Sequence, residues 1–405
     1  MKHRTIILPV FFSLIFIIIF DVNAQIKIGA VVQDKNGVPI PYASVFNSNS
    51  HRGCITNEEG RFELNTQAGD TIVIRCLGYS EYQNTAEQIQ KAGIVVLNEA
   101  IYNLDEVNVT HNLYDVKPLI RKFHSKIRKN YPTRPIKITG VYKEYSQIEN
   151  EYYGFLQCDV DILFNSMASF SRPSIKTKVH DYKFLQHQNR KGGTFIELEG
   201  HLRGFWLFRM SFLWNFKEYQ HSYLGSFIYN GSIIIKIKFY PKQINESAIQ
   251  FNGIMYIDSK TSALIFLRYE LLSNERDFYL YKGLWQKAIK GNAQMMFEFN
   301  NGYYFPAYEI RTQTSEAIIS DWEIKPNNQD TISVDFVYNF FTKNVEYKPK
   351  GFEGDSHLFE TLTNRDIFDQ SKDYKSDFIL ETEQEKQLME SKHSSIKRHK
   401  KSHSE

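Results

Sequence analysis

Apolar and polar residues alternate with different periods along this chain of 405 residues. Residues 6–20 form an apolar run, residues 26–109 alternate in short stretches, residues 116–127 repeat at helical spacing, and alternation returns from residue 136 onward. A period of two is typical of half-buried strands, and a period near 3.6 is typical of amphipathic helices. The pattern therefore predicts a mainly β protein in which a helix connects two β regions.

The first 24 residues have the parts of a secretory signal peptide. Residues 2–4 are basic, residues 6–20 are apolar, and small residues precede a predicted cut between Ala24 and Gln25. The apolar run is shorter than the roughly 20 residues that a membrane-spanning helix needs, and an uncleaved anchor is the alternative. No cysteine stands at the cut, so no lipid anchor is expected. We predict an exported chain, in the periplasm or associated with the outer membrane.

Residues 25–110 are predicted to form a small β-sandwich. The alternating stretch 26–32 is followed by turn signals at 34–37, 56–60 and 69–70, and each turn precedes another short apolar stretch. Short strands separated by turns at this spacing are typical of sandwiches.

Several blocks of this region resemble the carboxypeptidase regulatory-like domain. They are 29–32 (GAVV), 34–37 (DKNG), 39–45 (PIPYASV), 56–62 (TNEEGRF), 69–70 (GD), 77–79 (LGY) and 104–107 (LDEV). The resemblance implies a prealbumin-like, Ig-like sandwich, common at the N-terminus of exported and outer-membrane proteins of the Bacteroidetes type. In metallocarboxypeptidases this module is an accessory to the enzyme and carries no zinc ligand. The resemblance therefore implies a location in the cell envelope and a fold, but no catalytic group.

Residues 111–131 are predicted to form an amphipathic connecting helix. Asp115 is the expected N-cap, Pro118 falls in the first turn, and Tyr131-Pro132 ends the helix. The opposite face is basic: Lys117, Arg121, Lys122, Lys126, Arg128 and Lys129. This face is either a solvated surface or a contact with anionic lipid headgroups or lipopolysaccharide.

A larger antiparallel β domain is predicted over residues 132–378, as a curved sheet or half-barrel. The expected strands are 138–147, 152–163, 177–185, 232–240, 248–257, 263–271, 293–299, 303–312 and 331–340. The dipeptide Asn301-Gly302 is a strong hairpin signal, and residues 258–261 are the expected turn between two other strands.

The hairpins in this region resemble the half-barrel of periplasmic lipoprotein carriers and lipoprotein-sorting proteins. The resemblance rests on the block 251–258 (FNGIMYID), followed by the strand 263–271. Residues 130–132 and 140–144 also resemble the region that follows the regulatory-like module in exported Bacteroidetes proteins. A half-barrel of this kind implies that the protein holds an acyl chain or another apolar ligand and does no chemistry on it.

An aromatic segment at residues 205–216 is the candidate for contact with such a ligand or with a membrane. The residues proposed for this contact are Phe205, Trp206, Phe208, Phe212, Trp214 and Phe216. The segment is too short to span a membrane as a helix, but Trp tolerates the headgroup zone. It could also be a lid over a cavity, or simply part of the core.

Composition and charge narrow the function classes. The net charge of +3 and the lack of a recognisable module argue against nucleic-acid binding. Three cysteines, Cys54, Cys76 and Cys158, are too few for a disulfide scaffold or a metal cage. We expect reduced buried thiols, with a bridge between Cys54 and Cys76 as the alternative. No metal and no cofactor is expected.

Fragments of catalytic motifs occur but are incomplete. His357 and Glu360 have the HxxE spacing of zinc carboxypeptidases, yet the histidines that follow lie in a polar tail. Residues 354–356 (GDS) lack the Asp and His partners that a serine hydrolase requires. Asp159 and Asp161 have the i, i+2 spacing of carboxylates on one strand face, which is common on solvated sheets.

The tail, residues 379–405, is polar and is predicted to be disordered. Taken together, we predict an exported, non-enzymatic envelope protein that binds a lipid, an acyl chain or an envelope partner. The alternatives are a structural or interaction module at the outer membrane and, less favoured, a peptidase-like hydrolase.

Overall fold

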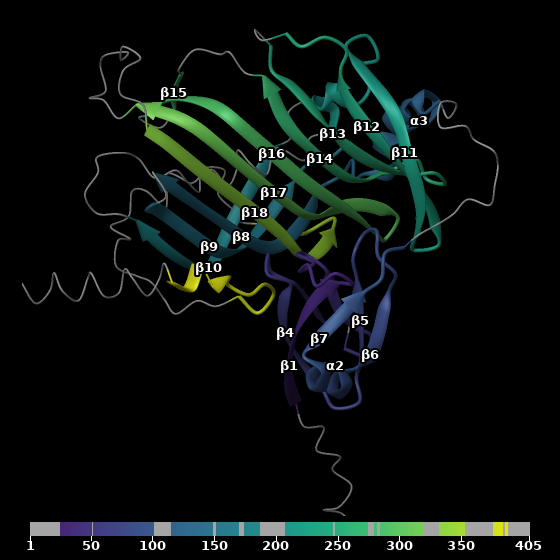
Figure 1. Cartoon of the computed structure of the whole chain (residues 1–405), viewed down its shortest axis with the longest axis vertical. Helices are drawn as coiled ribbons and strands as arrows, with labels where there is room; N and C mark the ends of the chain where they lie inside the picture. The colour runs from purple at the N-terminus through teal and green to yellow at the C-terminus, as the bar shows by residue number, and fades with distance from the viewer. Residues whose placement is uncertain are drawn as a thin grey trace, which may run out of the picture. The chain divides into compact units, whose positions relative to one another are not determined.

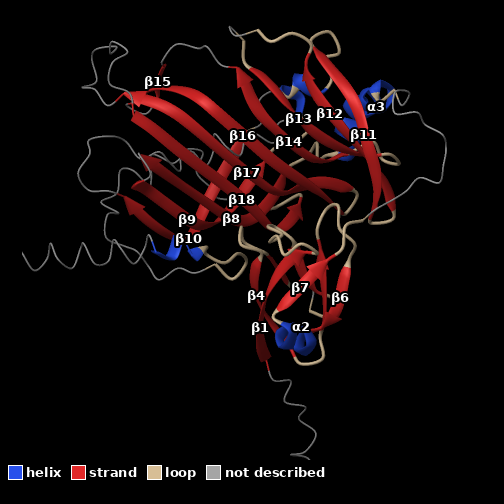
Figure 2. Cartoon of the chain, viewed as in Figure 1, coloured by secondary structure: helices blue, strands red, loops and turns tan. Residues whose placement is uncertain are grey.

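The computed structural model describes residues 25–50, 52–100, 115–148, 151–169, 174–186, 207–245, 248–273, 279–281, 284–318, 332–352, 376–383 and 385–387. The predicted signal peptide and the 104–107 block lie outside these residues. Strands dominate the described part of the chain (Figure 2), which confirms the predicted mainly β class. The chain forms two compact units: residues 1–99 with 379–382, and residues 100–378 with 383–405.

The first unit is a sandwich of two small sheets around one core. One sheet has the order β4 (Arg61–Gln67), β1 (Gln25–Asp34), β7 (Ile94–Leu97); the other has β3 (Gly53–Ile55), β2 (Ser44–Asn47), β5 (Thr71–Arg75), β6 (Tyr82–Thr85). Helix α2 (Ala86–Ala92) follows β6 and precedes β7, which pairs in parallel with β1. The core contains Ile28, Val32, Val45, Phe62, Ile72 and Ile74, all nearly or fully buried.

The predicted turns of this unit are confirmed. Gly37, Gly60 and Gly69 all have positive φ, which glycine adopts without steric cost. The Asp34 carboxylate accepts hydrogen bonds from the backbone N–H groups of Asn36 and Val38, at 2.8 and 2.9 Å. These turns place the inward residues of each strand on the core side, as the alternation predicts.

The second unit is built on one open, twisted antiparallel sheet (Figure 1). Its order is β10 (Ile175–Gln186), β9 (Glu151–Phe164), β8 (Ile136–Ile148), β18 (Ile332–Tyr347), β17 (Tyr303–Ile318), β16 (Leu284–Asn300), β14 (Leu264–Ser273), β13 (Gln250–Asp258), β12 (Ser232–Pro241), β11 (Tyr219–Tyr229). The short β15 (Tyr279–Tyr281) pairs with β16. Within the described residues, β10 and β11 each have one partner, so the sheet has two edges.

Every predicted strand of this unit is present, and β16, β17 and β18 are longer than predicted. Asn301 and Gly302, both at positive φ, form the predicted two-residue hairpin between β16 and β17. The Asp258 carboxylate accepts hydrogen bonds from Lys260 and Thr261 in the predicted turn between β13 and β14. Strand β11 was not predicted, although Asn230-Gly231 makes the same kind of hairpin between β11 and β12.

The two faces of this sheet carry different side chains. Strand register and alternation place Phe239, Tyr269 and Arg311 on one face, which we call the pocket face. Lys143, Asn339 and Gln157 lie in one row on the opposite face, which we call the tail face. The tail face contacts the chain near its C-terminal end, where the Lys143 ammonium binds the Glu385 carboxylate at 2.7 Å.

The prediction of an unstructured tail from residue 379 is therefore wrong for the residues up to 387 that are described. Ile379, Thr382 and Glu385 are buried, at 4%, 6% and 3% exposure. Their sequence is polar, and only a buried partner such as Lys143 explains why Glu385 leaves solvent. No local pattern in the tail encodes that partner.

Helix α3 (Lys117–Asn130) lies over the pocket face with two short 3₁₀ turns, η2 (Leu207–Arg209) and η3 (Ser211–Leu213). Its buried residues are Leu119, Ile120, Phe123, Ile127 and Asn130. The N-cap is Val116 rather than the predicted Asp115, whose carboxylate instead accepts a hydrogen bond from the Lys117 N–H at 3.0 Å. At the other end, the buried Tyr131 hydroxyl donates to the Leu264 carbonyl at 2.7 Å.

Candidate binding pocket

A row of small residues on β16 creates a hollow in the pocket face. Ala288, Gly291 and Ala293 lie along this strand on the pocket face, while Tyr269 and Leu271 stand on the neighbouring β14. Strand register pairs Ala293 with Tyr269 on one side and with Arg311 on the other. Because the strands on both sides of β16 carry large side chains and β16 carries small ones, a space is left above β16 between its neighbours.

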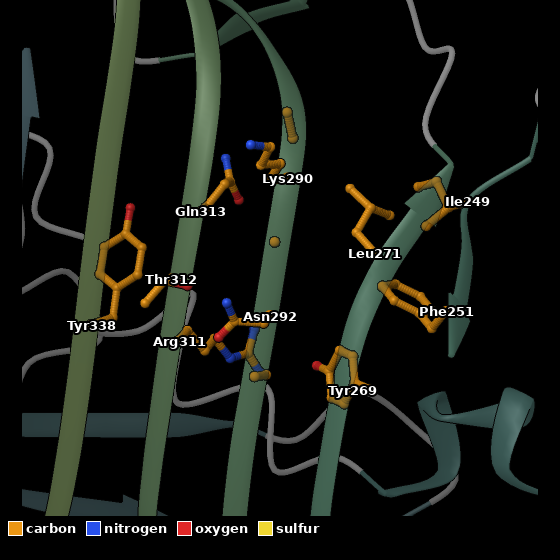
Figure 3. Close-up of a pocket in the computed structure, with 13 residues that line it drawn as sticks. Ile249, Phe251, Tyr269, Leu271, Lys290, Asn292, Arg311, Thr312, Gln313 and Tyr338 are labelled. Atoms are coloured by element: carbon orange, nitrogen blue, oxygen red, sulfur yellow. The ribbon is translucent and has the colours of Figure 1, made fainter. Parts of the chain in front are cut away.

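The resulting pocket has a volume of about 320 Å³. Its apolar wall consists of Ile249, Phe251, Tyr269 and Leu271, and Figure 3 shows these side chains on one side of β16. Arg311, Gln313 and Tyr338 stand on the other side, and Lys290 lies at the exposed margin. The pocket therefore has an apolar wall opposite a polar one.

The polar wall rests on a buried ion pair. Arg311 and Glu309, two residues apart on β17, are bonded through the Arg311 Nε and a Glu309 carboxylate oxygen. The Arg311 side chain is 23% exposed and that of Glu309 is 3% exposed. Burial raises the pKa of Glu309, and the Arg311 charge offsets part of this effect. Burial alone would lower the pKa of Arg311, but Glu309 outweighs it and the pKa is raised, so Arg311 stays cationic.

Phenol groups extend this polar wall along the same face. The buried Tyr142 hydroxyl donates to the Glu144 carboxylate at 2.7 Å, and Glu144 pairs in register with Tyr338, a pocket residue. Burial, followed by the neighbouring Glu144 charge, raises the pKa of Tyr142 well above its ordinary value. Burial also raises the pKa of Tyr269. These phenols stay protonated at neutral pH, and that of Tyr142 acts as a hydrogen-bond donor.

The lining combines apolar side chains with hydrogen-bonding and cationic groups. Its charged residues are Lys290 and Arg311, and among the described lining residues there is no carboxylate, histidine or cysteine. Within the part of the chain that the structure covers, no group of three or more His, Cys, Asp or Glu residues is placed to hold a metal ion. The pocket offers hydrogen-bond donors, one guanidinium and an apolar wall.

The aromatic segment proposed from the sequence lies beside the pocket. Phe205 and Trp206 are outside the described residues. The ring of Phe212 contacts Phe251 and Tyr269, with centroids 5.0 and 5.3 Å away, and both of these residues line the pocket. Phe212 therefore packs at the end of the pocket and does not cover it.

The other aromatic residues of the segment face α3. Trp214 lies 6.1 Å from Phe123 and 4.4 Å from His124, between ring centroids, and Phe208 lies 5.9 Å from His124. Phe208, Trp214 and Phe216 are all partly exposed. Their proposed contact with a ligand or a membrane stays a prediction.

The catalytic fragments of the sequence fall into two groups. Residues 354–356, His357 and Glu360 lie outside the described residues. Asp159 and Asp161 are described and have structural partners: Lys343 binds Asp159 at 2.9 Å, and Thr139 donates to Asp161 at 2.6 Å. Burial alone would raise the pKa of Asp161. The hydrogen bonds from Thr139 and His180 outweigh this effect, so the pKa is lowered below its ordinary value.

Cys54, Cys76 and Cys158 form no disulfide with one another in the described structure. Cys54 and Cys158 are buried, and Cys76 is partly buried. Within the described residues, no helix is long and apolar enough to cross a membrane.

Sequence reasoning missed every lining residue of the pocket. Ala288, Gly291 and Ala293 belong to β16, but their significance depends on which strands flank it, and the chain does not specify that locally. The one available signal was the low side-chain volume of 288–293 (AIKGNA) within a region otherwise rich in aromatic residues. A run of small side chains within a predicted strand also fits a β-bulge or the close approach of another backbone, so it does not by itself indicate a pocket.

Fold and site together define a small β-sandwich unit and a second unit with an open antiparallel sheet, one face of which carries the β16 pocket. Residues 28–109 match the CarboxypepD_reg-like domain, so the first unit is a domain of this kind. The chain is also 32% identical over 113 residues to the TonB-dependent receptor SusC of Bacteroides thetaiotaomicron. That match covers 27% of this chain and only 11% of the receptor's length.

Two solved structures share a distant likeness with the chain. One is a LolA superfamily protein from Nitrosomonas europaea, with 8% identity, a TM-score of 0.24, and coverage of 63% of this chain and 100% of that protein. The other is an outer membrane lipoprotein-sorting protein domain from Vibrio parahaemolyticus, with 10% identity, a TM-score of 0.26, and coverage of 62% and 100%. TM-scores this low carry no argument about ligand or function.

Proposed function

We propose that the protein is an exported, non-catalytic protein of the cell envelope that holds a lipid or an acyl chain in the β16 pocket. The observation that carries this proposal is the hollow of about 320 Å³ between Tyr269 and Leu271 on one side and Arg311 on the other. Small-molecule sites are typically concave, largely apolar and supplied with a few polar groups that fix orientation. An amphiphile fits such a pocket with its chain on the apolar wall and its polar end near Arg311.

The domain composition supports the envelope part of the proposal. The CarboxypepD_reg-like domain occupies residues 28–109, and a curated relative of the chain is a TonB-dependent receptor. The sequence before Gln25 has the composition of an export signal. These features are consistent with a protein that delivers, stores or senses an apolar molecule in the envelope.

The test is a search for a bound lipid. Native mass spectrometry of the protein purified from its own envelope is expected to show a co-purifying lipid, and a fluorescent fatty acid is expected to bind the delipidated protein. Gly291→Leu should abolish both signals, because a Cβ at Gly291 meets only ordinary contacts, 3.8 Å from Leu271 Cβ and Thr312 O, and the remaining side chain enters the hollow.

The matched control is Ser333→Leu, which adds the same side chain at an exposed position of β18 outside the pocket. It should bind like the unmodified protein. Absence of a bound lipid together with unchanged fatty-acid affinity in Gly291→Leu would overturn the proposal.

An interaction module is the second candidate, and the edge strand β11 favours it. This strand has one partner among the described residues, and it exposes Leu224 and Ile228 at 53% and 43%. An exposed strand edge can pair with an extended segment of another protein. Retention of a defined envelope protein on immobilised full-length chain, lost in Ile228→Pro but kept in the pocket variant Gly291→Leu, would favour this reading.

A further inference from the structure

Helix α3 presents a basic face to solvent. Its exposed cationic residues are Lys117, Arg121, Lys122, Arg128 and Lys129. The helix has no Asp or Glu between residues 117 and 130. Within the described part of the chain, Lys117, Arg121, Lys122 and Lys129 form no ion pair. A helix that needs only solubility commonly mixes both signs of charge on its outer face, and this one does not.

Partly exposed aromatic rings border the same face. The Arg121 guanidinium lies over the Phe216 ring, 5.4 Å from its centroid. Trp214 stacks at a tilt against His124 of α3, with centroids 4.4 Å apart. The rings of Phe216 and Trp214 therefore lie at the helix margin, where the cations are.

Further cations come from outside the helix. Lys242, just after β12, donates from its ammonium group to the Phe216 carbonyl at 2.8 Å. Lys117 and Lys242 both contribute to lowering the pKa of His221. Lys217 is exposed next to Phe216. Two acids flank this area, Asp115 before α3 and Glu218 after Lys217, so cations predominate in it.

We propose that α3 and residues 214–217 form a docking surface for an anionic phospholipid membrane. Exposed Lys and Arg side chains near a membrane surface are attracted by anionic headgroups. Aromatic rings such as those of Trp214 and Phe216 are stable at the depth of the headgroups. The net charge of the chain is only +3, so the basic character belongs to this face and not to the whole protein.

This combination favours a membrane over other polyanions. A surface that binds single-stranded nucleic acid usually combines cations with aromatic rings that are free to stack on bases. Here Trp214 packs on His124, and Phe216 lies against Arg121 and His221. Half-buried rings beside flexible cationic side chains suit the headgroup region of a membrane, into which the rings can insert to a shallow depth. The surface is independent of the β16 pocket, because none of its residues lines that pocket.

The experiment is vesicle flotation of the protein that begins at Gln25, after the predicted signal peptide. Vesicles of phosphatidylcholine alone are compared with vesicles of phosphatidylcholine and phosphatidylglycerol. The protein is expected to float with the anionic vesicles only, and added salt is expected to release it. The triple variant Arg121→Glu, Lys122→Glu, Lys129→Glu is expected to lose about tenfold or more in affinity.

A control variant makes the same change of charge elsewhere. Lys176→Glu, Lys178→Glu and Lys350→Glu reverse three exposed cations away from α3 and should leave flotation unchanged. Circular dichroism and thermal melting establish that both variants are folded. Equal binding to neutral vesicles, equal loss in both variants, no binding at all, or release of the protein by a short single-stranded DNA at the same charge concentration as the lipid would overturn the proposal.

Discussion

Two glycines on the pocket face illustrate how one residue type serves opposite purposes. A Cβ at Gly253 would lie 2.1 Å from the Arg268 carbonyl oxygen and 2.8 Å from the Phe239 ring, so this glycine is required for close packing. A Cβ at Gly291 would make only ordinary contacts at 3.8 Å. Gly291 is therefore not required by the packing of the sheet, and what it preserves is open space.

We expect Gly253→Ala and Gly291→Ala to change stability in opposite directions. Gly253→Ala overpacks the sheet and should lower the free energy of unfolding by about 1–3 kcal/mol. Gly291→Ala should raise it by up to about 1 kcal/mol, because glycine within a strand costs conformational entropy. Urea unfolding followed by circular dichroism measures both, and equal effects of the two substitutions would contradict this account of the pocket.

His221 makes stability depend on pH. Burial lowers the pKa of His221 to about 4, and the carbonyl oxygens of Leu213 and Phe212 offset only part of this effect. Neither ring nitrogen makes a well-formed hydrogen bond in the structure. The folded state thus prefers the neutral ring. Its contribution to stability is complete above the ordinary pKa of 6.5 and is lost as the pH falls from there toward 4.

We expect the unmodified protein to lose about 3 kcal/mol of unfolding free energy between pH 7 and pH 4 through this residue. His221→Phe retains the ring contact with Phe216, whose centroid lies 5.2 Å away, and removes the titration. Denaturant midpoints measured at several pH values should therefore fall less steeply in the variant. Parallel pH curves for the two proteins would assign the acid sensitivity to other groups.

Individual elements of the fold depend on partners that are distant in sequence. Strand β8 carries Lys143, whose ammonium group contacts both carboxylate oxygens of Glu385, at 2.7 and 2.8 Å. The two side chains are 2% and 4% exposed. An ion pair this deeply buried makes the C-terminal segment part of the sheet's cover on the tail face.

We expect Glu385→Ala to lower the unfolding free energy by about 3–5 kcal/mol, because it leaves the Lys143 charge buried without a partner. Lys143→Met in the same background should recover most of that loss, because an apolar chain of similar length removes the unpaired charge. Chemical denaturation of the two single variants and the double variant gives the coupling between the residues. Additive losses would show that the pair is not coupled.

The sequence predicted most elements of the fold because their signals are local. Alternation marked β8, β9 and β12, and the Asn301-Gly302 dipeptide marked the β16–β17 hairpin. Strand β11 was missed because the aromatic segment before it dominated the pattern, although Asn230-Gly231 carries an equivalent hairpin signal. The pocket and the order in residues 379–387 were not predictable, because each depends on which distant strands become neighbours.

At the scale of the whole molecule, the sandwich has a core of its own. Residues such as Ile28, Val45 and Phe62 pack within one closed cluster drawn from both of its sheets. Four residues from the far end of the chain, Ile379–Thr382, also belong to this unit, and the Glu381 carbonyl accepts a hydrogen bond from the Asn57 amide at 3.4 Å.

We therefore expect residues 25–100 to fold alone, with a modest unfolding free energy of about 3–5 kcal/mol, as is usual for a domain of this size. A synthetic peptide covering residues 376–387 should raise the melting temperature of the fragment when added in excess. Dispersed amide signals in a two-dimensional NMR spectrum would establish folding. A collapsed spectrum would show that the sandwich requires the rest of the chain.

The pairing of β8 with β18 in the middle of the large sheet has a consequence for the order of events in folding. These strands are separated in sequence by most of the second unit, and closing so long a loop is slow and entropically costly. A chain synthesised from its N-terminus can assemble β8, β9 and β10 early. The second edge of β8 then stays without its hydrogen-bonding partner until β18, near the end of the chain, has been made. During that interval, the unpaired edge of a central strand is available to other chains, so this is the stage of folding at which the protein is most exposed to aggregation.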